Sequence, residues 1–214
     1  MADFAIQRKT MVDNQIRTMD VQDHAVIAAF STVPRETFVP EGLRTLAYID
    51  RPVVLAGGRA LAQPGPLARL LQSALPLPGE KVLVVGGATG YTAALMADIG
   101  CVVTMLEQDA ALVAEAKTAL AETTVHVVEG ELTAGCAADA PYDLIFFDGS
   151  IEVLPAAFEA QVAEGGRIVA IEGTGQAAKA VVRVKASGRL SARFAFNTPL
   201  PALPGFARKP EFAL

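Results

Sequence analysis

The 214-residue sequence has no tryptophan, only two cysteines and two histidines, and no excess of basic residues. Cys101 and Cys136 are widely spaced, which argues against a disulfide framework and the usual metal sites, so we expect no metal and a reduced, cytoplasmic compartment. The first residues lack the apolar core of a signal peptide, and no apolar run is long enough to cross a membrane. A net charge of −5 without a basic stripe predicts no nucleic-acid partner.

Hydrophobic residues make up 52% of the chain and charged residues 19%, a composition that excludes disorder and fits one α/β unit with additions. Of the 18 basic and 23 acidic residues, eight and seven lie in residues 1–78, so ten and sixteen follow in residues 79–214. The acidity therefore lies in the second part. We expect a helical, substrate-side region over 1–78 and a ligand-binding α/β region over 79–214, forming one compact unit.

The stretch from Lys81 to Tyr91 organises the chain. Four apolar residues, 82–85, predict a buried strand, and a glycine-rich turn with Gly86, Gly87 and Gly90 leads into an apolar helix over 91–99. Such a unit presents bare backbone N–H groups to a ligand.

The strand predicted next, 101–106, ends in Glu107. This residue lies 107 − 86 = 21 positions after Gly86, the spacing at which an acidic side chain binds a ribose diol. Together with the glycine turn, this spacing predicts a nucleoside-ligand site.

The remaining patterns predict helices around this unit and further strands after it. We expect helices over 4–19, 25–30, 34–38, 40–46, 67–75, 110–122 and 154–163, strands over 124–128, 142–148 and 167–171, and a hairpin of 178–185 with 190–196. Five β-α units closed by a hairpin are the order of S-adenosylmethionine-dependent methyltransferases. The predicted class is α/β: a Rossmann-like sheet with helices on both faces, a helical N-terminal extension and a C-terminal antiparallel hairpin.

Six segments carry a family resemblance over nearly the full length: 11–17, 33–40, 47–52, 62–64, 86–91 and 165–167. Through them the chain resembles protein-L-isoaspartate (D-aspartate) O-methyltransferases. The resemblance implies S-adenosyl-L-methionine as cofactor and a protein or peptide carrying isoaspartate as substrate. It also implies the cofactor-binding residues: the glycine turn with Tyr91 for the methionine part, Glu107 with Gln108 for the ribose, and Gly130 with Glu131 for adenine.

The substrate loop departs from the family at Arg59, Ala60 and Ala62, where the family has Gln, Thr and Ser. The family's two hydroxyls lie at the isoaspartyl carboxylate, so we expect weak or absent isoaspartyl activity. Two departures also fall in the glycine-turn unit: Val84 stands where the family has an acidic residue, and Ala88 where it has a glycine.

Arg59 and Asp148 are the candidate catalytic residues, each with two interpretations. Arg59 either binds a substrate carboxylate through two hydrogen bonds or is a solvated loop arginine. Asp148, at the end of a central strand, is either a general base for a hydroxyl or amine acceptor or a cap for the next helix.

Three functions are therefore open. The chain is an isoaspartyl methyltransferase, or a methyltransferase for a different carboxylate, hydroxyl or amine, including an unidentified small molecule. The third possibility is a protein that retains this fold to bind the cofactor or a protein partner and has little enzymatic turnover.

Overall fold

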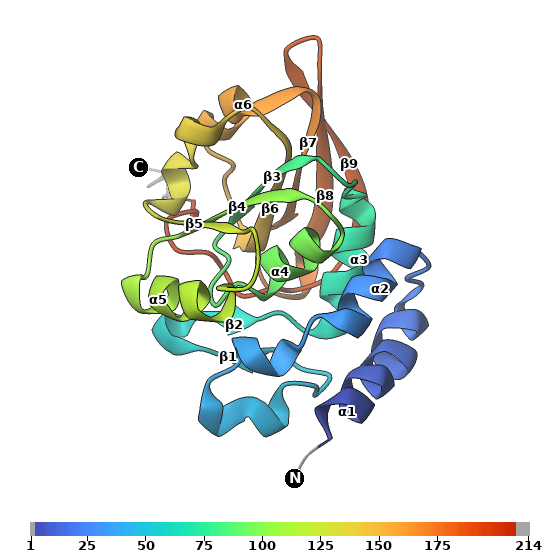
Figure 1. Cartoon of the computed structure of the whole chain (residues 1–214). Helices are drawn as coiled ribbons and strands as arrows, with labels where there is room; N and C mark the ends of the chain where they lie inside the picture. Colours follow the sequence, from blue (N-terminus) through green and yellow to red (C-terminus); the bar gives the residue numbers. More distant parts are fainter. Residues whose placement is uncertain (1–2, 209–214) are drawn as a thin grey trace, which may run out of the picture.

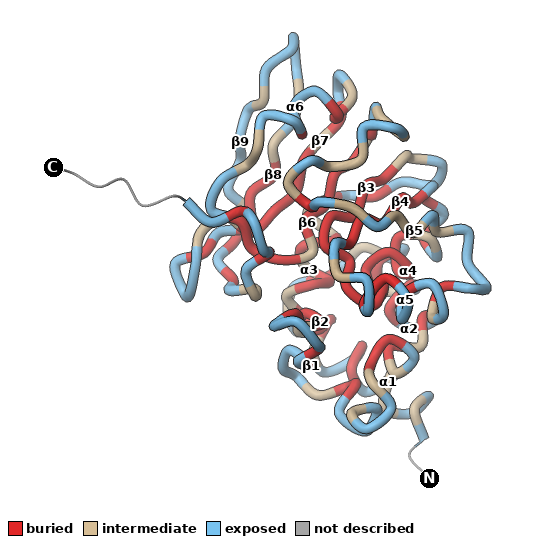
Figure 2. Tube along the Cα trace, turned by 90° about the vertical axis from the view of Figure 1, so that its left-hand side faces the viewer, coloured by how far each residue is buried: buried red, intermediate tan, exposed pale blue. Residues whose placement is uncertain are grey.

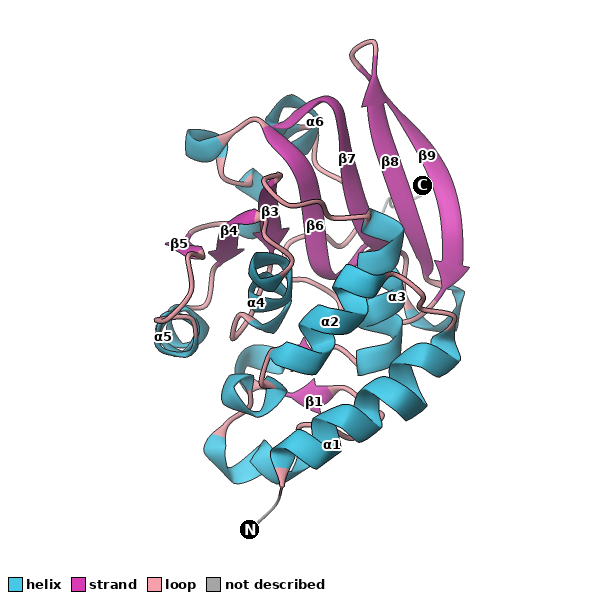
Figure 3. Cartoon of the chain, turned by 45° about the vertical axis from the view of Figure 1, so that its right-hand side comes forward, coloured by secondary structure: helices cyan, strands magenta, loops and turns pink. Residues whose placement is uncertain are grey.

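The structure, a computed structural model, describes residues 3–208. Its centre is a seven-stranded sheet in the order β5-β4-β3-β6-β7-β8-β9, in which β3 to β7 are parallel and β8 and β9 form an antiparallel hairpin at one edge (Figure 3). The strands are β3 (Lys81–Val85), β4 (Val102–Glu107), β5 (His126–Glu129), β6 (Tyr142–Ile151), β7 (Val162–Glu172), β8 (Lys179–Ala186) and β9 (Arg189–Asn197). The predicted fold class is confirmed.

The N-terminal region is helical, as expected, and lies beside one face of the sheet (Figure 1). It contains α1 (Phe4–Met11), which continues as a π-helical turn and a 3₁₀ turn to Met19, then α2 (His24–Thr32), two 3₁₀ segments (Arg35–Phe38, Glu41–Leu46), the short antiparallel strands β1 (Val53–Val54) and β2 (Ala60–Leu61), and α3 (Pro64–Ala74). Helix α3 begins at Pro64, three residues before its predicted start. Its first turn can contain two prolines because the first N–H groups of a helix have no hydrogen-bond partner within the helix.

Side chains of the central strands alternate between two hydrophobic cores, one on each face of the sheet. Figure 2 shows the buried segments along the sheet. Val82 and Val84 of β3 face the N-terminal helices, α4 (Tyr91–Asp98) and α5 (Ala110–Ala119). Leu83 and Val85 face the other side, which is covered by α6 (Ala157–Gln161) and by Leu203 of the C-terminal segment. Helices thus lie on both faces, but unequally.

The helix predicted over 154–163 is wrong in extent. Only α6, a helix of five residues, forms there, and the chain is already extended at Val162, which pairs with Tyr142 of β6. The predicted strand over 167–171 is correspondingly longer, because β7 takes in the glycine pair Gly165–Gly166. Parallel pairing with β6 overrides the local helical pattern here.

The sheet reverses its winding direction between β3 and β6. From β3 the chain adds β4 and β5 on one side, and later adds β6 and β7 on the other. Ligands of open α/β sheets bind outside the carboxyl ends of the strands at such a reversal. The carboxyl ends of β3, β4 and β6 lie at this reversal. The candidate residues there are Gly86 directly after β3, Glu107 at the end of β4 and Asp148 near the end of β6.

Within the part of the chain that the structure describes, we find no helix that combines the length and the apolarity needed to span a bilayer.

Candidate functional site

The glycine turn after β3 has an unusual backbone conformation. Gly86 has φ +73° and Gly90, which precedes α4, has φ +99°, so both adopt the left-handed backbone that glycine favours. Ala88 also lies in this region, at φ +51°. A side chain at such a φ costs about 1–2 kcal/mol, so the alanine at this position carries strain that a glycine avoids.

The three glycines of the turn have different neighbours. A Cβ atom at Gly87 would lie 2.6 Å from Met105, and one at Gly90 would lie 2.6 Å from Leu120, so internal packing requires glycine at both positions. A Cβ atom at Gly86 would instead point into the space at the strand ends, where it would meet Leu203 at 2.6 Å and Arg59 at 3.0 Å. Of the three, Gly86 is the one whose missing Cβ atom faces Arg59 and Leu203.

Glu107 is the polar centre of the site, and its side chain is fully buried at the end of β4. Its carboxylate accepts hydrogen bonds from the backbone N–H groups of Ala88 (2.9 Å), Gln108 (2.9 Å) and Asp109 (3.2 Å). It also accepts from Nη1 of Arg59, which lies 2.9 Å from Oε1 and 2.8 Å from Oε2. Glu107 thus ties the end of β4 to the turn after β3.

Arg59 is not a solvated loop residue, so that interpretation is wrong. Its side chain is 7% exposed, and while Nη1 binds Glu107, Nη2 donates to the carbonyl oxygen of Gly86. The guanidinium expected to bind a substrate carboxylate binds the chain's own carboxylate instead.

Asp148 lies in an irregular stretch of β6. Phe146 pairs with Val169 of β7 and Ser150 pairs with Ile171, so four steps along β6 correspond to two steps along β7 and the register shifts. Such bulges redirect side chains and are frequent beside active sites. The interpretation of Asp148 as a cap of the next helix is wrong, since α6 begins only at Ala157 and no side chain caps it.

Asp148 is electrostatically unusual. Burial raises the pKa of its carboxyl to about 6, and the Thr92 hydroxyl and the guanidinium groups of Arg59 and Arg35 only partly offset this. A half-buried carboxyl near the end of a central strand, with a pKa near neutrality, has the properties of a general acid or base.

We expect Asp148→Asn to stabilise the protein at pH 8 by about 1–3 kcal/mol, because each pKa unit corresponds to about 1.4 kcal/mol and the amide removes a buried charge. The folded-state pKa is raised, so wild-type stability rises as pH falls through about 6, and the advantage of the variant shrinks over the same range. Urea unfolding at pH 8 and pH 5 measures both effects. An equal difference at the two pH values would contradict the raised pKa.

Tyr91 contributes mainly to packing. Its fully buried ring contacts Phe30 and Phe38 at centroid distances of 6.0 and 5.5 Å, and the Arg35 guanidinium lies 4.8 Å from its centroid. Burial raises the pKa of its phenol to about 12, so the hydroxyl stays neutral. The side chain of Tyr91 therefore belongs to the core beneath the turn.

The residues predicted for adenine lie at the next strand end. Gly130 follows β5 and donates its N–H to the carbonyl oxygen of Glu107 at 3.0 Å, while Glu131 is exposed and accepts a hydrogen bond from the Thr133 hydroxyl. Gln108 is also exposed. These three residues rim the end of the sheet at β4 and β5, beside the buried Glu107.

Sequence reasoning missed two residues of this region, Arg35 and Leu203. Arg35 is fully buried and donates hydrogen bonds to the carbonyl oxygens of Ala47 and Ala62, each at 2.7 Å, so it joins the segment before β1 to the substrate loop. Its place in the Val-Pro-Arg motif was the available signal. Leu203 lies in a proline-rich stretch that has no strand or helix pattern, so no signal marked it.

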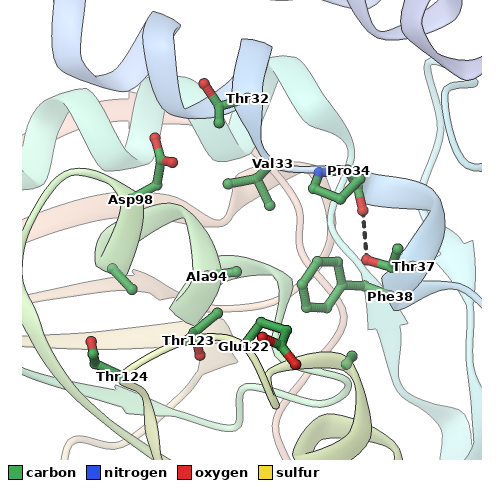
Figure 4. A pocket seen from close by; sticks show the side chains of 12 residues that line it. Thr32, Val33, Pro34, Thr37, Phe38, Ala94, Asp98, Glu122, Thr123 and Thr124 are labelled. Carbon is green, nitrogen blue, oxygen red and sulfur yellow. Dashed lines mark hydrogen bonds between the residues drawn. The ribbon is translucent and has the colours of Figure 1, made fainter.

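A cavity of about 530 Å³ lies elsewhere, between α2, α4 and the end of α5 (Figure 4). Its wall combines threonines with the carboxylates of Asp98 and Glu122, and it includes none of the candidate site residues. Among residues 3–208, no group of three or more His, Cys, Asp or Glu side chains is placed to hold a metal ion.

The donor set at the strand ends fits the implied cofactor in kind. It has a buried carboxylate after β4 for a ribose diol and a glycine after β3 where a ligand would approach the backbone. The space itself, however, contains the side chains of Arg59 and Leu203. The residues fit S-adenosylmethionine in chemistry.

Comparison with known proteins gives the family of the chain. The family described as Protein-L-isoaspartate(D-aspartate) O-methyltransferase (PCMT) matches residues 6–196. Protein-L-isoaspartate O-methyltransferase 1 of Rhodopseudomonas palustris (strain HaA2) is 39% identical over 184 residues, which cover 85% of this chain and 75% of the relative. The protein-L-isoaspartate O-methyltransferase of Koribacter versatilis (strain Ellin345) is 37% identical over 190 residues, covering 87% and 86%.

Two solved structures share the fold. One, a protein-L-isoaspartate O-methyltransferase, has a TM-score of 0.82 and 25% identity, and the match covers 92% of this chain and 66% of that one. The other, a putative protein-L-isoaspartate O-methyltransferase from Plasmodium falciparum in complex with S-adenosyl-L-homocysteine, has a TM-score of 0.80 and 19% identity, covering 92% and 97%. By sequence, over most of its length, the chain belongs to the protein-L-isoaspartate (D-aspartate) O-methyltransferase family.

Proposed function

We propose that this chain is an S-adenosylmethionine-dependent methyltransferase that esterifies a carboxylate on a protein or peptide, as the names of its relatives indicate. The observation that carries the proposal is the position of Glu107. It is a buried carboxylate at the end of β4, hydrogen-bonded to the turn after β3, 21 residues beyond Gly86 by 107 − 86. Titration calorimetry with S-adenosylhomocysteine and a methyl-transfer assay on an isoaspartyl peptide test the proposal.

The residues of the chain have a limited chemical task in such a reaction. When bound, the cofactor supplies a methyl group that its sulfonium already activates. A carboxylate acceptor is ionised at pH 7, so the protein needs to align the two groups and exclude water more than to move protons. Arg35 serves alignment, because its bonds to the carbonyl oxygens of Ala47 and Ala62 hold the loop that faces the acceptor.

The loop itself predicts low isoaspartyl activity. Ala60 is half-buried in β2 and Ala62 is buried directly after it, and neither side chain offers a hydrogen bond to an acceptor carboxylate. Hydrogen bonds to a charged group contribute roughly 1.5–3 kcal/mol each, so the absence of two hydroxyls weakens binding and alignment considerably.

Restoring both hydroxyls should raise the activity. We expect the double variant Ala60→Thr with Ala62→Ser to increase kcat/KM for an isoaspartyl peptide by about 10- to 100-fold, since about 1.4 kcal/mol corresponds to a factor of ten. Ala56→Ser, in the exposed turn of the same loop, is the matched control and should change nothing. Robust isoaspartyl activity of the wild type, or no gain in the double variant, would contradict this assignment of the loop.

A hydroxyl or amine acceptor is the second candidate, and Asp148 favours it. Such an acceptor must lose a proton, and a crevice carboxyl with a pKa of about 6 is suited to take it at neutral pH. With this acceptor, Asp148→Asn should abolish transfer while cofactor affinity stays within a few-fold. With a carboxylate acceptor, the same variant should retain turnover.

A further inference from the structure

We propose that the chain closes its own cofactor site: Arg59 and Leu203 occupy the places of the ribose and of the adjoining part of S-adenosylmethionine, so that cofactor binding requires both side chains to leave. This inference rests on the proposed function. It is carried by three contacts at the strand ends, namely Arg59 with Glu107, Arg59 with Gly86, and Leu203 with Gly86.

The first step concerns the hydrogen-bonding capacity of Glu107. A carboxylate has about four lone-pair positions. In this structure three backbone N–H groups and Arg59 Nη1, which bridges both oxygens, are bound to it. The backbone donors are part of the fold and remain. Three of the four positions therefore stay taken, and a ribose hydroxyl gains access to the remaining one only if the guanidinium withdraws.

The second step concerns the loop that delivers Arg59. Between β1 and β2 the chain turns at Ala56–Gly58, where Gly57 and Gly58 have φ values of +63° and +72°, and the N–H of Leu55 donates to the carbonyl oxygen of Arg59 at 2.8 Å. A Cβ atom at Gly57 would lie 2.9 Å from Oδ2 of Asp109. The turn thus rests on the residues just beyond β4, and Figures 1 and 2 show β1 and β2 beyond that end of the sheet.

The third step concerns Leu203, which fills the rest of the space. Its N–H donates to the carbonyl oxygen of Ser150 at 2.8 Å, and the N–H of Ser150 donates to that of Pro201 at 2.9 Å, so the C-terminal segment runs along the end of β6. The Leu203 side chain is buried against two glycines. A Cβ atom built on Gly86 would lie 2.6 Å from this side chain, and one built on Gly149 would lie 2.7 Å from it. Gly86 directly follows β3 and Gly149 lies within β6, and these are the two strands between which the sheet reverses.

Arg59 and Leu203 each replace a contact that the cofactor would make. Arg59 takes the position on Glu107 that a ribose hydroxyl would take, and Leu203 covers the bare backbone of Gly86. A protein whose binding-competent state is a fraction of the population binds more weakly by that fraction, so the closed arrangement lowers the apparent affinity for the cofactor. Removing an occupant should therefore strengthen binding, whereas removing an ordinary contact residue weakens it.

The experiment measures S-adenosylhomocysteine binding to the full chain by titration calorimetry. We expect Arg59→Gln to bind at least tenfold more tightly than wild type, and Leu203→Ala about three- to tenfold more tightly. Arg44→Gln, which replaces an exposed arginine of the N-terminal region, should bind within twofold of wild type. Thermal unfolding gives a second readout, in which the ligand should raise the midpoint of Arg59→Gln more than that of wild type.

The outcomes separate this inference from the proposed function. If wild type and both variants bind S-adenosylhomocysteine equally, or if the variants bind more weakly, the self-occupied site is overturned while the methyltransferase assignment stands. If folded wild type and folded variants all fail to bind it, both are overturned. Leu203→Ala leaves the Arg59–Glu107 pair intact, so it remains a test should Arg59→Gln prove too unstable to assay.

Discussion

Replacing Glu107 with alanine should lower the free energy of unfolding by about 3–5 kcal/mol, because it leaves the buried charge of Arg59 without its counter-charge. The pair is almost fully desolvated, with side-chain exposures of 7% for Arg59 and 0% for Glu107. Three backbone N–H groups at the end of the sheet lose their acceptor as well. Urea unfolding at pH 7 measures the loss, and the same variant should not bind S-adenosylhomocysteine.

A double-mutant cycle separates the ion pair from the rest of the effect. Glu107→Ala combined with Arg59→Met removes both charges, so it should lose less stability than Glu107→Ala alone. Asp13→Ala is the control for an exposed pair, because Asp13 and Arg17 lie 3.5 Å apart at the surface, and it should change stability by less than about 1 kcal/mol. A loss for Glu107→Ala as small as that of the control would show that the buried pair does not form in solution.

The second large effect is expected for Arg35→Ala, with a loss of about 3–5 kcal/mol from an unfilled cavity and unpaired buried carbonyl groups. Arg35 is fully buried, and its two 2.7 Å hydrogen bonds join Ala47 to Ala62 across the substrate loop. Its guanidinium also lies over the ring of Tyr91 at the start of α4. Its removal therefore breaks the link between residues 47 and 62 and the contact of both with the start of α4.

Two further variants, measured by denaturant unfolding, make the Arg35 prediction specific. Arg35→Lys keeps the charge but reaches at most one of the two carbonyl groups, so we expect an intermediate loss. Arg44→Ala, at an exposed position, should stay within about 0.5 kcal/mol of wild type. Equal stability of Arg35→Lys and wild type would contradict a role that depends on the two-pronged guanidinium.

Local sequence predicted the sheet well because its strands carry strong patterns. The apolar run 82–85 forms β3 with the glycine turn directly behind it, and the polar turn near Gly188 joins β8 and β9 as the predicted antiparallel hairpin. The pattern was misleading where a strand partner decides the conformation. Val162 belongs to a helical pattern in the sequence, but it pairs with Tyr142 in the sheet.

The sequence by itself determined the family, the order of strands and helices, and the position of Glu107 opposite the glycine turn, because these depend on short-range patterns and fixed spacings. Only the tertiary structure decided what contacts Glu107 and Gly86. Arg59 lies 48 residues before Glu107 along the chain, by 107 − 59, and Leu203 lies 117 residues after Gly86, by 203 − 86. Contacts over such separations arise from how the loop and the C-terminal segment pack on the strand ends, and no local pattern encodes that packing.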